Sequence, residues 1–179
     1  MIEVVDYDAA WPQRFEQLRA TIWPAVSDVA IAIEHVGSTA VPGLAAKPVI
    51  DLDIIVADSQ SVRAVIASLA TLGYMHRGDL GVTGREAFTT PDGAPRHNLY
   101  VCLDGCVSLR NHLLIRDYLR VHRETADEYG DLKRRLARAF ADDIDAYIAG
   151  KTAFLCAILA ASGMAQQEIA SVRLANDLA

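Results

Sequence analysis

Two aspartates stand inside the most apolar stretch of the chain. Asp51 and Asp53 interrupt the run PVIDLDIIV at residues 48–56, whose β-branched residues predict a strand. Residues i and i+2 of a strand project from the same face, so the two carboxylates should lie side by side. Because two close negative charges in an apolar strand are costly, this spacing predicts a cation between them.

A Gly-Ser pair precedes the aspartates. Gly37 and Ser38 follow a β-rich run, VAIAIEHV at residues 29–36. A glycine lets the backbone approach a ligand closely, and the exposed N–H groups of a helix start bind phosphate. Phosphate beside Asp51 and Asp53 would be repelled unless Mg²⁺ joined them, which predicts a metal–phosphate site with in-line attack at phosphorus. The alternative is that the aspartates lie on an exposed face and Gly37 only makes a turn.

Hydrophobic periodicity and capping residues predict the elements that position these side chains. We expect an α/β (α+β) chain, with a mixed β-sheet flanked by helices and a helical C-terminal part. We expect a single domain over residues 1–179, with a sheet-containing core over 1–105 and a helical part over 106–179. The expected elements are a helix from about 10 to Pro24, strands over 29–36 and 48–56, a helix from Asp58 to Leu72, strands around 74–76, 85–89 and 96–103, and helices over 108–122, 124–140 and from 142.

The composition narrows the classes of function. The net charge of −6 gives no general attraction to nucleic acid, so we expect no nucleic-acid partner. Three cysteines without a C-x-x-C spacing argue against a disulfide framework and against a zinc site. The start MIEVVDYD lacks the pattern of a signal peptide, and the run AFLCAILAA at 153–161 is too short to span a bilayer. We expect a cytoplasmic protein without a membrane partner.

The combination of Gly37-Ser38 and Asp51-x-Asp53 resembles the signature of the nucleotidyltransferase superfamily, the fold of DNA polymerase beta. The chain is most similar to one branch, the GrpB family. The segments that carry this resemblance are YDAAWPQRF (7–15), HVGSTAVPGLAAKPVIDLDI (35–54), RHNLYV (96–101), HLLIRDYLRVH (112–122) and YIAGKTAF (147–154). The resemblance implies a nucleotidyltransferase-like fold, a triphosphate at Gly37 and Ser38, and a divalent metal ion at Asp51 and Asp53.

One departure from the superfamily pattern concerns a third carboxylate. Active nucleotidyltransferases usually add this acid from a later strand. Here that strand is RHNLYVCLD, which offers His97 and Asn98 at the corresponding place and an acid only at its far end, Asp104. A neutral imidazole can bind a metal or act as a general base. We therefore expect His97 as a third catalytic residue with a modified role, or a site that binds nucleotide without the usual chemistry.

Three further residues lie near the predicted site. His35 directly precedes the Gly-Ser pair and either faces the substrate or packs against backbone. Lys47 leads into the acidic strand and is either a phosphate or acid partner or a solvated lysine. Arg96 begins the last strand and either neutralises phosphate or is simply exposed.

The predicted helix over 108–122 carries a basic stripe. His112, Arg116 and Arg120 share one arc of this otherwise apolar helix. A buried cation needs an anionic partner, which is either an internal acid such as Asp117 or Asp51, or a group of the substrate. We expect His112, Arg116 and Asn98 to contact the acceptor or a phosphate. The short basic run KRRLAR at 133–138 is expected to be a solvated helix face.

These observations together predict a Mg²⁺-dependent nucleotidyltransferase. Mg²⁺ or Mn²⁺ would be the cofactor, an NTP (ATP first among the candidates) would be the donor, and a small molecule would be the acceptor. One alternative is a non-catalytic nucleotide- or coenzyme A-binding regulatory module, because some GrpB-family members are fused to dephospho-coenzyme A kinase. A second alternative is an enzyme that uses the same scaffold for ligation or hydrolysis at an activated acid.

Overall fold

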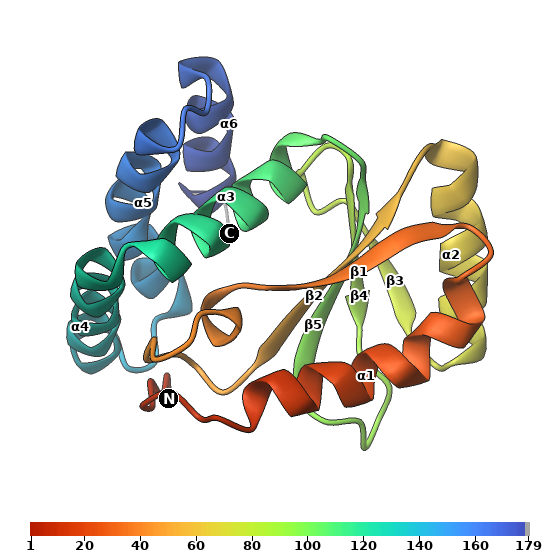
Figure 1. The fold of residues 1–179 in the computed structure, drawn as a ribbon, viewed down its shortest axis with the longest axis horizontal. Helices are drawn as coiled ribbons and strands as arrows, with labels where there is room; N and C mark the ends of the chain where they lie inside the picture. Colours follow the sequence, from red (N-terminus) through yellow and green to blue (C-terminus); the bar gives the residue numbers. More distant parts are fainter. Residues whose placement is uncertain (178–179) are drawn as a thin grey trace. The chain divides into compact units, whose positions relative to one another are not determined.

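The computed structural model describes residues 1–177 (Figure 1). Residues 178 and 179, the end of the expected helical part, lie outside the described residues. The chain divides into two compact units. Unit 1 comprises Met1–Ala9, Gly37–Pro48 and the chain from Asn111 onward, and unit 2 comprises Ala10–Val36 and Val49–Arg110.

Unit 2 holds a mixed five-stranded sheet. The strands are β1 (Ala30–Val36), β2 (Ile50–Val56), β3 (Met75–Gly78), β4 (Arg85–Thr89) and β5 (His97–Leu103), in the order β1-β2-β5-β4-β3. Only β2 and β5 pair in parallel, and β1–β2, β4–β5 and β3–β4 pair antiparallel. The mixed sheet with flanking helices confirms the expected fold class.

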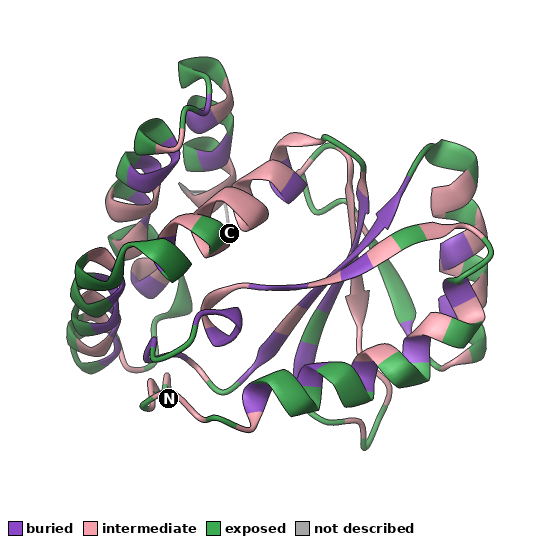
Figure 2. Ribbon diagram, viewed as in Figure 1, coloured by how far each residue is buried: buried purple, intermediate pink, exposed green. Residues whose placement is uncertain are grey.

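The acidic strand is central in this sheet. β2 lies between β1 and β5, and six of its seven residues are buried (Figure 2). Its register sets Asp51 opposite Asn98 and Asp53 opposite Tyr100. Partners in register share a face of the sheet, so these four side chains project from the same side.

The helices of unit 2 follow from clear sequence features. α1 (Trp11–Val26) carries Pro12 in its first turn and buries Trp11, Phe15, Leu18, Ile22 and Val26 at helical spacing. α2 (Ser59–Thr71) begins after Asp58, whose side chain accepts a hydrogen bond of 2.8 Å from the backbone N–H of Ser61. α1 contacts β1, β2 and α2, and α2 contacts β3 and β5.

Both strand histidines project from the face opposite the aspartates. His35 is buried and stacks on Phe15 of α1, with ring centroids 4.7 Å apart. His97 adjoins Asn98, so it points away from Asp51. It is buried, and its Nε2 accepts a hydrogen bond of 2.8 Å from the Tyr74 hydroxyl. The expectation that His97 joins the acidic pair is therefore wrong, because side chains alternate along β5.

Unit 1 packs its helices around the segment Gly37–Pro48. The helices are α3 (Val107–Val121, in this unit from Asn111), α4 (Arg123–Ala139), α5 (Ile144–Ala161) and α6 (Gln166–Asp177). A short 3-10 helix, η1 (Ser38–Ala40), begins the inner segment. Its neighbours Val41 and Leu44 share a core with Leu119, Ala126, Tyr129 and Ile158. The Gly-Ser pair thus starts a segment held by three helices of the same unit.

The helical part differs from the expectation in several details. The last expected helix is two helices, because α5 ends at Ala161 and Gly163 adopts a left-handed φ of +82° before α6. α3 (Val107–Val121) and α4 (Arg123–Ala139) each begin and end one residue earlier than expected.

The apolar run at 153–161 belongs to the longer helix α5. By length and composition alone, α5 is the one helix in residues 1–177 that could cross a membrane, a test that a core helix of a soluble protein also passes. Only 28% of its residues are buried. The buried positions are Tyr147, Thr152, Cys156, Ile158 and Leu159.

We predict that His97 makes the stability of the protein fall in mild acid. Burial lowers the pKa of His97 below its usual value, although its Nδ1–H donates to the Pro95 carbonyl. The unfolded chain therefore takes up a proton near pH 6.5 that the folded chain resists, and the free energy of unfolding falls as the pH drops below about 6.5. Urea unfolding from pH 5 to 8 should show a shallower acid slope for His97→Gln than for the wild type. Equal slopes would contradict this account.

Candidate functional site

The residues around the aspartates form one polar surface, which we call the acidic face. It consists of Asp51 and Asp53 of β2, Asn98 and Tyr100 of β5, and Arg85 of β4. Arg85 pairs with Cys102 in the ladder, two residues beyond Tyr100, and so projects from the same side. All five residues belong to unit 2. The structure thus brings the two predicted metal ligands together with Asn98.

The two aspartates differ in their surroundings. Asp51 is half-buried, and its Oδ1 accepts a hydrogen bond of 2.7 Å from the Asn98 side-chain amide. Asp53 is fully buried, with an exposed fraction of 0%. Burial of a carboxylate next to a second one is costly unless positive charge or hydrogen-bond donors offset it. This arrangement favours a cation at the acidic face.

Tyr100 and Arg85 add a neutral donor and a cation. Burial raises the pKa of Tyr100 to about 12, and the negative charge of Asp51 contributes to the same shift. The phenol therefore stays protonated at neutral pH. The Arg85 guanidinium lies 4.7 Å from the centre of the Tyr100 ring, a cation–π distance. Arg85 was not among the residues predicted from sequence, because nothing local relates residue 85 to residues 51 and 53.

The acidic face does not form a metal cage by itself. Glu34 lies opposite Asp53 in the β1–β2 ladder, yet within residues 1–177 no group of three His, Cys, Asp or Glu side chains is arranged to hold a metal ion. Mg²⁺ is commonly held by one or two carboxylates, with phosphate oxygens and water completing its shell. Asp51 and Asp53 therefore fit an ion that arrives with a phosphate ligand.

Unit 1 supplies a second polar feature, which we call the Ser38 turn and define as Gly37–Ala40. Gly37 has φ +70° and ψ −172°, a conformation that a residue with a Cβ rarely adopts. The Ser38 Oγ accepts a hydrogen bond of 2.7 Å from the Lys133 Nζ. The Nε of Arg120 donates to the Ala40 carbonyl at 3.0 Å. Two cationic side chains thus contact this turn.

Lys133, like Arg85, is a site residue that the sequence analysis missed. Its run KRRLAR was expected to be solvated, but Lys133 is 2% exposed, and its Nζ lies 4.4 Å from the centre of the Tyr129 ring. Tyr129, Lys133 and Ala137 occupy the buried face of α4 at the i, i+4, i+8 spacing. That spacing is the signal that could have identified an inward lysine.

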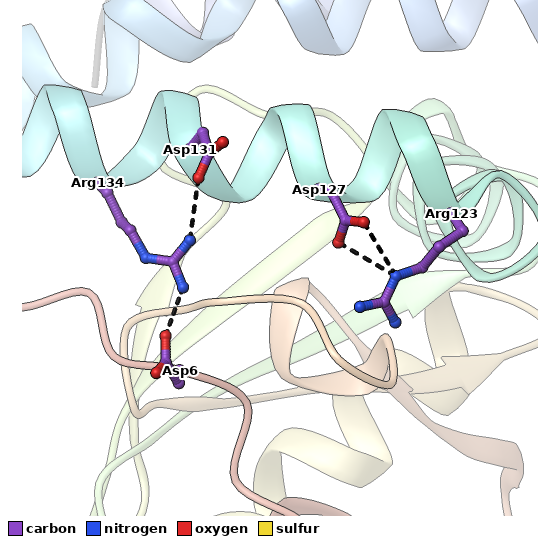
Figure 3. A network of polar contacts seen from close by, with 5 residues as sticks. All are labelled: Asp6, Arg123, Asp127, Asp131 and Arg134. Atoms are coloured by element: carbon purple, nitrogen blue, oxygen red, sulfur yellow. Dashed lines mark hydrogen bonds and ion pairs between the residues drawn. The ribbon is translucent and has the colours of Figure 1, made fainter.

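Two other cations of α4, Arg123 and Arg134, lie in surface ion pairs (Figure 3). Arg134 pairs with Asp131 at 3.1 Å and also contacts Asp6. Arg123 pairs with Asp127 at 3.1 Å. These pairs are more exposed than Lys133, and such pairs contribute little to stability. Lys133 therefore differs from these two arginines in that its side chain is buried.

The remaining predicted residues have varied positions. The Arg116 Nε pairs with Asp117 at 2.7 Å, which matches the internal-acid alternative. The Lys47 Nζ lies 5.9 Å from the centre of the Tyr147 ring in unit 1. His112 is half-buried on α3, and Arg96 is exposed before β5. The structure brings neither Arg96 nor the two strand histidines to Asp51 and Asp53.

Comparison with known proteins relates the chain to a family of bacterial proteins. It is 35% identical over 150 residues to the UPF0157 protein YqkA of Bacillus subtilis and 38% identical over 162 residues to the UPF0157 protein PA4798 of Pseudomonas aeruginosa. These matches cover 84% and 88% of this chain, but only 44% and 66% of the two relatives. A dephospho-CoA kinase of Mycolicibacterium paratuberculosis is 26% identical, with 84% of this chain and 43% of the kinase covered.

Solved structures agree with this relationship. The GrpB protein of Enterococcus faecalis has a TM-score of 0.80 and 33% identity, over 89% of this chain and 96% of that one. The Cid1 poly(U) polymerase, crystallised with MgGTP, has a TM-score of 0.52 and 15% identity, over 75% of this chain and 44% of that one. The second likeness shows a nucleotidyltransferase-like fold and no more. Residues 1–161 match the family described as GrpB protein, and the chain therefore belongs to the GrpB family.

Proposed function

We propose that the protein is a Mg²⁺-dependent nucleotidyltransferase that moves a nucleotidyl group from an NTP to a small acceptor. The observation that carries this proposal is the pair Asp51 and Asp53 on one face of a central, buried strand. Asp51 and Asp53 would hold the ion, which when bound supplies positive charge to the phosphates. The nucleotidyltransferase-like fold supports the same function.

The Ser38 turn is the part of the chain that we propose to bind phosphate. Val36, the last residue of β1, pairs with Asp51, and Gly37 is the next residue along the chain. A triphosphate there would accept hydrogen bonds from the Ser38 hydroxyl and the Lys133 ammonium.

Transfer would need a group that takes the proton of the acceptor hydroxyl as its oxygen bonds to phosphorus and pyrophosphate leaves. β5 presents Asn98 and Tyr100 beside the aspartates. An amide cannot accept this proton, and a phenol with a pKa of about 12 stays protonated at neutral pH. We therefore propose that the proton of the acceptor hydroxyl passes to Asp51, the more exposed carboxylate, or to the leaving phosphate itself.

The lack of a β5 carboxylate favours a second candidate function. A non-catalytic module that binds nucleotide or coenzyme A would need the phosphate contacts but no general base. One relative of the chain is named dephospho-CoA kinase, which is consistent with such a module. An enzyme that acts on an activated acid is the third possibility. Dependence on metal distinguishes the transferase from the binding module.

We predict a Mg²⁺-dependent rise in melting temperature with one of the four NTPs. Saturation at about 100 times Kd should raise the melting temperature by about 5–10 °C for a chain of this size. Asp51→Asn should abolish the dependence on Mg²⁺, whereas Asp104→Asn, at the exposed end beyond β5, should retain it. A shift with coenzyme A that ignores Mg²⁺ would support the binding module instead. No shift with any of the ligands would contradict both readings.

We predict that Lys133→Met weakens triphosphate binding about 10- to 100-fold, because a charge-assisted contact is lost from a buried position. Arg135→Met is the matched control, since Arg135 lies two residues along the same helix and is exposed. Isothermal titration with inorganic triphosphate, without metal, measures the contribution of Lys133 separately from that of the aspartates. Equal affinities of the two variants would remove Lys133 from the proposed site.

A further inference from the structure

Arg85 is the cationic residue of the acidic face, and the nucleotidyl transfer proposed above gives it no role. It is the first residue of β4 and lies opposite Cys102 of β5. Its side chain is half-buried, and its Cζ lies 4.7 Å from the centre of the Tyr100 ring. Tyr100 in turn lies opposite Asp53 of β2. The sheet therefore places Tyr100 between the cation of β4 and the acids of β2.

The guanidinium of Arg85 has a hydrogen-bond donor without an acceptor. Its Nε is buried and has no hydrogen-bond partner within residues 1–177. The neighbouring acid, Glu86, projects from the other face of β4, and its carboxylate is hydrogen-bonded to the His76 Nε2 at 2.6 Å. The Tyr100 ring attracts the positive charge but does not replace an oxygen acceptor. A buried donor without an acceptor costs free energy, which a ligand oxygen at this position would recover.

The side chains that surround Arg85 on this face carry no negative charge. On β4 and β5, the residues that share its side of the sheet are Ala87, Asn98, Tyr100 and Cys102. The acids Asp51 and Asp53 lie on β2, on the far side of β5 from β4, and are the proposed ligands of Mg²⁺. When the ion neutralises them, the charge of Arg85 is left for another anion.

An arginine held in this way suits an oxyanion. The planar guanidinium presents parallel N–H donors that match two oxygens of a carboxylate or a phosphate. Contact with an aromatic ring orients the side chain before a ligand arrives, which lowers the entropic cost of binding. Partial burial strengthens the charge-assisted hydrogen bond, because less water screens it.

We propose that Arg85 binds a carboxylate or phosphate group of the acceptor, so that the acceptor of the nucleotidyl transfer is an anionic small molecule. This inference rests on the proposed function, because an acceptor presupposes the transfer. The strand order supports it, since the ion and the reacting phosphorus would lie at β2 and Arg85 lies beyond Tyr100 on β4. Neighbouring strands are about 4.8 Å apart, so β4 lies about 10 Å from β2. The anionic group is therefore several bonds away from the hydroxyl that reacts.

The test follows the Nε–H resonance of Arg85 in ¹H–¹⁵N spectra of the whole chain, without metal or nucleotide. The resonance is assigned through its connection to the Arg85 backbone. Arg63, exposed on α2 of the same unit, provides the control resonance. Sodium acetate and sodium phosphate are titrated separately, with sodium chloride at equal ionic strength as the reference.

We expect acetate, phosphate or both to shift the Arg85 resonance until it saturates, while the Arg63 resonance does not saturate. The anion that binds more tightly identifies the group carried by the acceptor. An Arg85 resonance that responds to acetate and phosphate no more than to chloride would overturn the proposal.

A second titration separates the acceptor from the donor. It repeats the first in the presence of Mg²⁺ and each NTP in turn, and the anion should still reach Arg85. If an NTP alone shifts the Arg85 resonance and excludes the anion, Arg85 binds the donor phosphates and the acceptor assignment is wrong. If no NTP binds, the acceptor role fails together with the transferase, whereas saturation in the first titration still establishes an anion site at Arg85.

Arg85→Lys measures the contribution of the guanidinium, because it keeps the charge and removes the parallel donors. Its affinity for the tighter anion, measured by isothermal titration, should fall about tenfold. Arg63→Lys is the matched control and should bind as the wild type does. Equal affinities of the two variants would remove Arg85 from the anion site, and the wild-type resonance decides even if Arg85→Lys fails to fold.

Discussion

The organisation of this protein depends on two carboxylates that must share one face of a central strand. Asp51 and Asp53 are separated by one residue of β2, and the pairing with β1 on one side and β5 on the other fixes their direction. A shift of one residue in register would move both acids to the face where Phe15 packs on His35. The hydrophobic pattern of the sheet therefore also determines where the charge lies.

The Ser38 turn belongs to a different part of the chain, and two cationic side chains, Lys133 and Arg120, contact it. Gly37 needs its left-handed φ to leave β1 and begin η1. The turn then lies against α4, where a buried lysine contacts the serine hydroxyl. Burial of a lysine costs free energy, and an anionic ligand at this turn would offset part of that cost. The Ser38 turn thus carries positive charge, as the proposed phosphate contact requires.

Local sequence patterns predicted the strand, its two aspartates and the Gly-Ser turn, because alternation and apolar runs act over a few residues. They did not predict which residues of β5 lie on the same face of the sheet as Asp51. Asn98 and His97 are neighbours that point to opposite faces, and only the β2–β5 register decides which of them lies opposite Asp51. Lys133 and Arg85 were missed for a related reason. Their importance arises from contacts with residues far away in sequence, such as Ser38, 95 positions away.

If the acidic face is a metal–phosphate site, it lacks one protein ligand. The most direct measurement is the effect of Mg²⁺ alone on the unfolding free energy of the wild type and of Asn98→Asp. The variant replaces the donor to Asp51 by a third carboxylate, so without metal it should be less stable by about 1–3 kcal/mol. Mg²⁺ should restore its stability while leaving the wild type unchanged. If Mg²⁺ does not restore the stability of Asn98→Asp, the acidic face is not a metal site.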